Sequence, residues 1–127
     1  MKQTNRKGFT LAELLIVVAI IAVLVAIAIP VFTTQKYKAE LAVDQANIRS
    51  YYAELQTDYL LTRKIDTTKL HEPNGTMEDG LTDLILSGSN VTLKVGTYWV
   101  RAPGDDSGYQ IMYFSKKGNV YVVYPNE

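Results

Sequence analysis

Residues 9–32 read FTLAELLIVVAIIAVLVAIAIPVF, and Thr10 and Glu13 carry the only polar side chains in this run. An α-helix rises about 1.5 Å per residue, so about 20 residues cross a hydrocarbon core roughly 30 Å thick. The run meets that length, and three basic residues precede it. Basic flanks stay on the cytoplasmic side of a membrane. The sequence therefore predicts a helix that enters the membrane with its N-terminus inside the cell.

Glu13 distinguishes this segment from two ordinary kinds of N-terminal apolar sequence. A secretory signal peptide is one alternative, because Ala26-Ile27-Ala28 forms a small-residue cleavage pattern after an apolar run. A plain signal anchor is the other. Neither gives a role to a carboxylate, which costs about 2–3 kcal/mol inside a membrane helix on insertion scales. Glu13 is therefore a candidate functional residue that needs a partner.

A chain cut between Gly8 and Phe9 would supply that partner. Phe9 would gain a free α-amine, which is positively charged near neutral pH. Glu13 follows Phe9 by four residues, about 6 Å along a helix axis. An ion pair gains more energy in an apolar medium than in water. The amine of the same chain or of a neighbouring chain is then expected to neutralise Glu13.

The stretch KGFTLAELLIVVAII at residues 7–21, with Pro30 further on, resembles the N-terminus of type IV prepilins and pseudopilins. The resemblance implies that residues 1–8 are a leader, cleaved between Gly8 and Phe9 by a prepilin peptidase. It implies N-methylation of Phe9 and pairing of its amine with Glu13 of an adjacent subunit during assembly. Pro30 matches a helix proline near which the helix kinks, since proline removes one backbone hydrogen bond.

The resemblance also implies a function. The chain would be a structural subunit of a type IV filament that serves adhesion, motility, DNA uptake or protein secretion. Its partners would be its own copies, other pilins, the peptidase and a membrane assembly platform. It would begin as a single-pass precursor in the cytoplasmic membrane and end in an extracellular filament or pseudopilus. The alternative is an extracellular binding module, released by cleavage after Ala28 or held by an uncut anchor.

Residues 33–127 are expected to form a globular head. Leu41, Ile48 and Leu55 recur every seven residues, with Tyr52 and Tyr59 beside them, which predicts an amphipathic helix over 33–61. We expect this stripe to pack on the head's own sheet. The charged helix residues lie mostly off the stripe: Lys36, Lys38, Glu40, Asp44, Arg49, Glu54 and Asp58.

The remainder predicts a connection over 62–90 and an antiparallel β-meander over 91–124. Within the connection, Thr76 is a candidate cap for a short helical piece that runs to Leu86 and ends at Gly88. The expected strands are 91–95, 97–102, 109–115 and 120–124, which are rich in Val and aromatic residues and separated by turn residues. Together with the long N-terminal helix, these elements predict an α+β, pilin-like fold.

Composition narrows the classes of function. The chain has no cysteine, so it lacks the C-terminal disulfide of many Gram-negative pilins, and we leave open a Gram-positive host or a pseudopilin. Removing the three basic residues of the leader leaves 10 basic residues against 13 acidic ones, a balance that predicts no general attraction to nucleic acid. The removed residues are Lys2, Arg6 and Lys7.

No catalytic, cofactor or metal site is predicted. His71 is the single histidine and lies in a polar stretch, and Ser107 and Ser115 lack the sequence context of a nucleophile. Asp105 and Asp106 invite a calcium hypothesis, but calcium takes six to eight oxygens and these residues also favour a turn. We therefore expect a non-enzymatic protein with a turn at this position.

Overall fold

The computed structural model describes residues 8–126, and the predicted leader lies outside these residues except for Gly8. The described residues form two compact units, which divide between Lys36 and Tyr37. One helix, α1 (Leu11–Thr62), contributes to both units. The sequence predicts a membrane helix within residues 9–32 and an amphipathic helix over 33–61, and α1 joins the two and ends one residue later, at Thr62.

The N-terminal unit is the apolar part of α1. Every residue from Leu11 to Phe32 is exposed, including the leucine, isoleucine and valine side chains on all sides of the helix. A soluble helix normally keeps such side chains on one buried face. This segment therefore depends on a membrane or on other chains to cover it.

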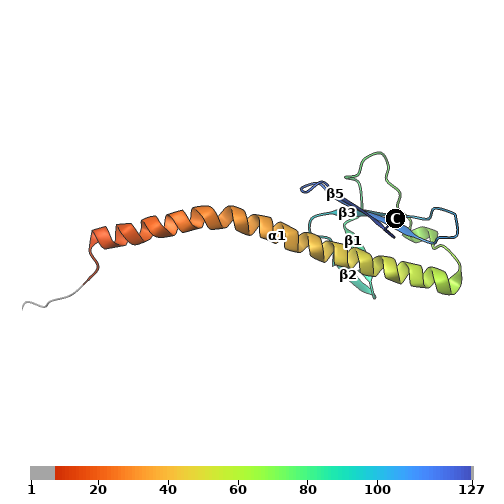
Figure 1. Ribbon diagram of the computed structural model, residues 1–127. Coiled ribbons are helices and arrows are strands. Elements are labelled where there is room, and N and C mark those ends of the chain that lie inside the picture. Colours follow the sequence, from red (N-terminus) through yellow and green to blue (C-terminus); the bar gives the residue numbers. More distant parts are fainter. Residues whose placement is uncertain (1–7, 127) are drawn as a thin grey trace, which may run out of the picture. The chain divides into compact units, whose positions relative to one another are not determined.

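Three strands of the C-terminal unit form an antiparallel sheet in the order β3-β4-β5. These strands are β3 (Thr97–Arg101), β4 (Gln110–Ser115) and β5 (Val120–Tyr124). They confirm the last three strands of the predicted meander. Figure 1 shows this sheet beside the second half of α1.

The core of the head lies between α1 and one face of this sheet. Ile48, Leu55 and Tyr59 of α1 are buried, and Leu41 and Tyr52 pack against the same cluster. The stripe predicted from the sequence thus packs on the head's own sheet. Burying a leucine or isoleucine side chain contributes about 1.5–3 kcal/mol, so this face anchors the helix. The sheet supplies Tyr98, Val100, Ile111, Tyr113 and Tyr124, and the remaining members include Tyr51, Leu84, Leu93 and Tyr109.

A β-hairpin stands where the sequence predicts a helical piece. β1 (Asp83–Leu86) pairs antiparallel with β2 (Ser89–Thr92) in a separate two-stranded sheet. The predicted helix up to Leu86 is wrong, and the expected strand 91–95 does not join the meander. The reason is the turn, because Ser87 and Gly88 both have positive φ (50° and 80°) and so form the two-residue connection that suits the twist of paired strands.

Asp44 is also placed differently from the sequence prediction, which put it off the buried stripe. Its side chain is completely buried. Asp44 Oδ1 accepts a hydrogen bond from Lys94 N at 2.7 Å, and Oδ2 accepts bonds from Val95 N at 2.8 Å and the Tyr113 hydroxyl at 3.1 Å. A buried carboxylate needs such donors to offset its loss of water. Asp44 therefore ties the β2–β3 connection to α1.

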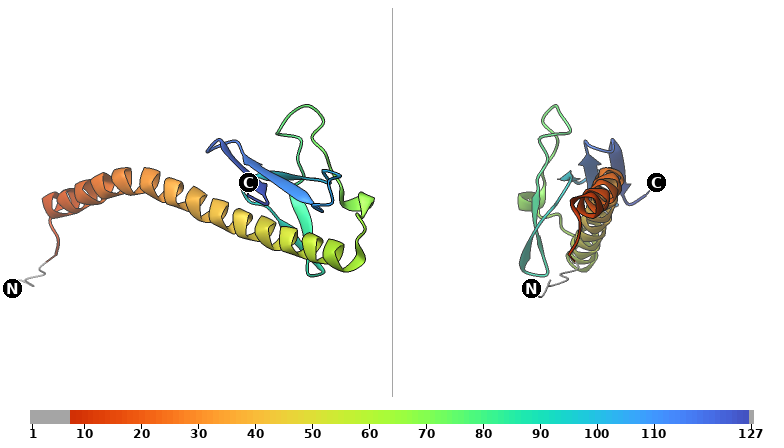
Figure 2. Two further views of the ribbon diagram at one scale, coloured as in Figure 1. Left: turned by 45° about the vertical axis from the view of Figure 1, so that its right-hand side comes forward. Right: turned by 90° about the vertical axis from the view of Figure 1, so that its left-hand side faces the viewer.

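A loop on the sheet projects away from α1 (Figure 2). It follows a short 3₁₀ helix, η1 (Thr67–Lys69), and its two ends are paired with β3. His71 exchanges backbone hydrogen bonds with Val100, and Leu81 does so with Tyr98, all at 2.8–2.9 Å. Residues 72–79 between these bridges are all exposed.

Candidate functional site: the N-terminus of the apolar helix

α1 begins with a reciprocal pair of hydrogen bonds between Thr10 and Glu13. Glu13 Oε2 accepts the Thr10 backbone N–H at 2.9 Å, and Thr10 Oγ1 accepts the Glu13 backbone N–H at 3.2 Å. Leu14 N bonds to Thr10 O at 3.1 Å, which starts the helical ladder. This is a capping box, in which two backbone donors at the helix start gain partners. The negative charge of Glu13 in the first turn also opposes the helix dipole.

The capping box gives Glu13 a role within its own chain. A plain anchor helix would therefore also have a use for this carboxylate. The pattern Thr-x-x-Glu directly before an apolar run is a recognised capping signal, and it was available in residues 10–13. Glu13 therefore has an intrachain partner whatever further partner assembly supplies.

The predicted cleavage site lies directly before this box. Phe9 is 83% exposed, and a Cβ atom added at Gly8 would meet no atom within 4 Å. Within residues 8–126, the fold thus gives no reason for glycine at position 8. Cutting the Gly8–Phe9 bond would leave both Thr10 hydrogen-bonding groups in place, so the capped helix start is compatible with such processing.

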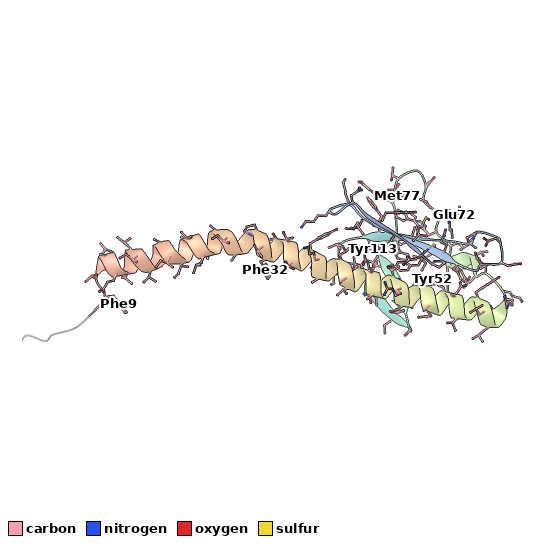
Figure 3. All side chains as sticks on the ribbon, in the orientation of Figure 1. Phe9, Phe32, Tyr52, Glu72, Met77 and Tyr113 are labelled. Carbon is pink, nitrogen blue, oxygen red and sulfur yellow. The ribbon has the colours of Figure 1, made fainter. Side chains whose placement is uncertain are left out.

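An apolar surface surrounds the helix beyond this site. Figure 3 labels Phe9 and Phe32, which bound the run, and side chains project from the helix all along it. α1 contains a segment long and apolar enough to cross a membrane, and no residue of that segment is buried. Glu13 is the one charged residue from Gly8 to Phe32. A carboxylate in such surroundings strongly favours a positively charged or hydrogen-bonding partner.

Pro30 lies inside α1, and the helix continues past it. Proline has no backbone N–H, so the carbonyl of Ala26, four residues earlier, loses its usual helical donor. The Pro30 carbonyl accepts hydrogen bonds from the hydroxyls of Thr33 at 2.9 Å and Thr34 at 3.0 Å. The hydrogen-bond ladder therefore has a defined weak point at this turn, although the helix is unbroken.

One comparison with known proteins concerns this N-terminal region. Residues 3–29 match the family described as the prokaryotic N-terminal methylation motif. The chain carries a prepilin-type N-terminus. It is also 52% identical over 50 residues to the type IV narrow pilus major component PilA5 of Thermus thermophilus. That alignment covers 37% of this chain and 43% of the relative. No solved structure matches the chain.

The prepilin-type N-terminus and the α+β arrangement of the head agree with the resemblance stated from the sequence. The long N-terminal helix packs its second half on a small antiparallel sheet, which is a pilin-like arrangement.

Three other side chains considered in the sequence, those of Ser107, Asp105 and His71, have local structural partners. Ser107 donates to Asp105 Oδ1 through its backbone N–H at 3.1 Å and also through its hydroxyl. These bonds hold the pKa of the Asp105 carboxyl below its usual range. His71 Nε2 lies 3.3 Å from the Asp79 carbonyl oxygen. Within residues 8–126, no three His, Asp or Glu side chains gather in a way that could hold a metal ion.

Proposed function

We propose that the chain is a structural subunit of a type IV filament, and that its mature form begins at Phe9 after removal of residues 1–8. The observation that carries the proposal is a capped helix that presents an uncovered apolar surface directly after a prepilin-type motif. A prepilin peptidase acting on the cytoplasmic side would cut between Gly8 and Phe9. N-methylation of Phe9 would follow.

In this proposal the membrane covers the apolar segment first, and neighbouring subunits cover it afterwards. The precursor spans the cytoplasmic membrane once, with its N-terminus inside, and a membrane assembly platform passes it into the filament. Packing between apolar helices replaces contact with lipid. The partners are other copies of the chain and related pilins. The similarity to a pilus component of Thermus thermophilus over 50 residues supports the proposal that the partners are pilins.

Glu13 would bind the Phe9 amine of an adjacent subunit in the assembled filament. Its Oε2 atom accepts the Thr10 N–H within the chain, and the carboxylate can accept several hydrogen bonds at once. Among apolar helices, an unpaired amine or carboxylate would be strongly unfavourable. The pairing would therefore favour correctly placed neighbours over misplaced ones.

Pro30 would be the place where α1 deforms during assembly. The missing N–H already removes one bond of the helical ladder there. The hydroxyls of Thr33 and Thr34 give the Pro30 carbonyl partners that do not depend on the helical backbone. A kink at this turn would thus cost less than elsewhere in the helix.

The mass and N-terminal residue of the mature protein test the processing step. Protein purified from the membrane fraction should begin at Phe9 and carry one additional methyl group. A chain that begins at Ile29 would show that Ala26-Ile27-Ala28 is a signal-peptidase site and that the protein is a secreted module. A chain that retains residues 1–8 would identify an uncut anchor.

Substitutions at Glu13 test the assembly step. Glu13→Ala should abolish or sharply reduce the yield of sheared filaments, because stranding one member of a buried ion pair costs about 3–5 kcal/mol. The amount in the membrane fraction should be unchanged or higher, since removing a carboxylate favours insertion. Glu13→Asp should give an intermediate yield.

Glu13→Gln separates pairing from capping. Glutamine can keep the capping box but carries no charge, so it should assemble as poorly as Glu13→Ala. Thr10→Ala removes the capping hydroxyl and keeps the charge, so it should assemble much better. Wild-type filament yield from Glu13→Gln, in cells without an unsubstituted copy, would rule out the pairing role.

A further inference from the structure

Asn74 is the one asparagine in the chain that a glycine follows. The backbone nitrogen after an asparagine can attack the side-chain carbonyl carbon, Cγ, and such reactions within one chain gain a large advantage in rate. A side chain on the following residue hinders this approach, most strongly when it is branched at Cβ. Glycine has no side chain to hinder it. Three other asparagines precede branched residues: Asn47, Asn90 and Asn119.

The surroundings of Asn74 leave this reaction unobstructed. Asn74 and Gly75 belong to the loop 72–79, in which every residue is exposed, and Figure 3 labels Glu72 and Met77 on either side of them. Gly75 has a φ of 106°, and a Cβ atom added to it would meet nothing within 4 Å. Within residues 8–126, no group forms a hydrogen bond with the Asn74 side chain or with the Gly75 N–H. The two reacting groups can therefore rotate towards each other.

The asparagines that precede branched residues lie where pairing holds the backbone. Asn47 lies within α1, so the N–H that follows it belongs to the helical ladder. Asn90 lies in β2, opposite Ile85 of β1. The Asn119 N–H is bonded across the turn between β4 and β5 at 3.2 Å. Closing a ring between adjacent residues would distort the backbone at these positions, whereas the tip of the loop 72–79 has no such pairing to lose.

We propose that Asn74 is a site of spontaneous deamidation, with water as the only reactant consumed. The Gly75 N–H gives its proton to hydroxide, and the nitrogen attacks Cγ of Asn74. The side-chain nitrogen takes a proton from water and leaves as ammonia, which restores the hydroxide. The new C–N bond closes a succinimide ring. A water molecule then opens the ring at one of its two carbonyl groups, which yields aspartate or isoaspartate at position 74.

The reaction adds a negative charge to the loop and leaves the fold of the head in place. The loop 72–79 already carries three acidic residues and no basic one. The backbone bridges of His71 and Leu81 to β3 hold the base of the loop, so the change is confined to its tip. The negative charge of this surface therefore increases with the time since the chain was made. This modification does not depend on the proposed filament function.

Incubating the full chain in detergent and oxygen-18 water tests the proposal, because the water that opens the ring leaves its oxygen on the product. Trypsin cuts after Lys69 and Lys94, so one peptide contains both Asn74 and the reference Asn90. Fragment ions of this peptide should show label at position 74, and conversion at position 90 should be slower by about tenfold or more. The rate at position 74 should rise with pH, because hydroxide takes the proton.

Two substitutions sharpen the test. Gly75→Ala adds a Cβ atom that hinders the attack, so conversion at position 74 should slow by about fivefold or more. Asn74→Asp carries the charge of the product from the start. Its melting temperature in detergent should match that of the unsubstituted chain, because position 74 is exposed.

A synthetic peptide of residues 70–94 is the reference for the conditions. Label at position 74 of this peptide but not of the full chain would show that the fold protects Asn74, and would overturn the proposal. Equal labelling of Asn74 and Asn90 in the full chain would overturn it too. So would a glycan on Asn74 in freshly purified protein, which the Asn-Gly-Thr pattern allows. Because the labelling needs no filament, failure of the filament function would leave this proposal standing.

Discussion

Glu13 in the apolar part of α1 and Asp44 in the head part both accept backbone hydrogen bonds, but their surroundings differ. Glu13 is exposed and caps the helix within its own first turn, so its partners lie three residues away. Asp44 is fully buried and accepts bonds from residues 50 to 69 positions away in the sequence. The bonds of Glu13 leave the apolar segment uncovered, whereas those of Asp44 join α1 to the β2–β3 connection within the head. One helix thus combines a segment that its own chain leaves uncovered with an element of a folded domain.

Removing Asp44 should give the largest effect on stability. Asp44→Ala leaves two backbone N–H groups and the Tyr113 hydroxyl without an acceptor, and we expect a loss of about 3–5 kcal/mol in the free energy of unfolding. That is a large part of the stability of a small domain. Thermal unfolding of the full chain in detergent, followed by near-ultraviolet circular dichroism, measures it.

Glu54→Ala is the matched control, because Glu54 also accepts a distant backbone N–H from the same helix but is exposed. Its loss should be about 1 kcal/mol or less. Equal losses for Asp44→Ala and Glu54→Ala would show that burial of Asp44 adds nothing to its hydrogen bonds.

Alkaline pH should destabilise the head and spare the apolar segment. Burial raises the pKa values of Tyr51, Tyr98 and Tyr113 above the usual value near 10. Above that pH the unfolded chain loses these protons while the folded head keeps them, so the free energy of unfolding falls as pH rises. The stabilisation is complete below about pH 10.

The apolar segment, residues 11–32, contains no tyrosine, and its helical signal in detergent should persist through the same titration. Measuring melting temperature and far-ultraviolet signal from pH 8 upwards compares the two regions. Tyr113→Phe should weaken the pH dependence. A melting temperature that stays constant up to pH 12 would contradict the burial of these hydroxyls.

The smallest effect on stability should come from Glu13→Ala. Loss of a capping interaction costs about 1 kcal/mol, and here it is confined to the first turn of α1. The melting temperature of the head should not change. Hydrogen exchange should become faster only at the first amides of the helix, Leu11 to Leu14. A lower melting temperature of the head would show that the two parts of α1 are energetically coupled.

The sequence predicts the elements that depend on local pattern. The apolar run, the amphipathic stripe around Ile48 and the three strands after Gly96 all follow from periodicity and turn residues. The Thr10–Glu13 capping box is also a local signal, whereas the partner expected for Glu13 is the Phe9 amine of its own or of a neighbouring chain. The resemblance of residues 7–21 to prepilins identified the N-terminal motif directly.

The elements missed depend on the tertiary structure. In the sequence, Gly88 looks like the glycine that ends a helix. Only the pairing of β1 with β2 shows that Ser87 and Gly88 form a hairpin turn. Aspartate on a helix is usually exposed, so the sequence alone indicates an exposed Asp44. It is buried because the backbone N–H groups of Lys94 and Val95 bond to its carboxylate in the folded head. Which face of α1 is exposed in the head becomes clear only once Ile48 and Leu55 fix the buried face.

The loop between His71 and Leu81 has a consequence for engineering. Its two ends are paired with β3 at Val100 and Tyr98, so the ladder of the sheet holds the base of the loop whatever the loop contains. Asn74 and Gly75 at its exposed tip can therefore accept a foreign peptide without altering the registers of the strands. In a filament, each subunit would display one copy of that peptide, which makes this loop the natural position for an epitope tag or a multivalent antigen.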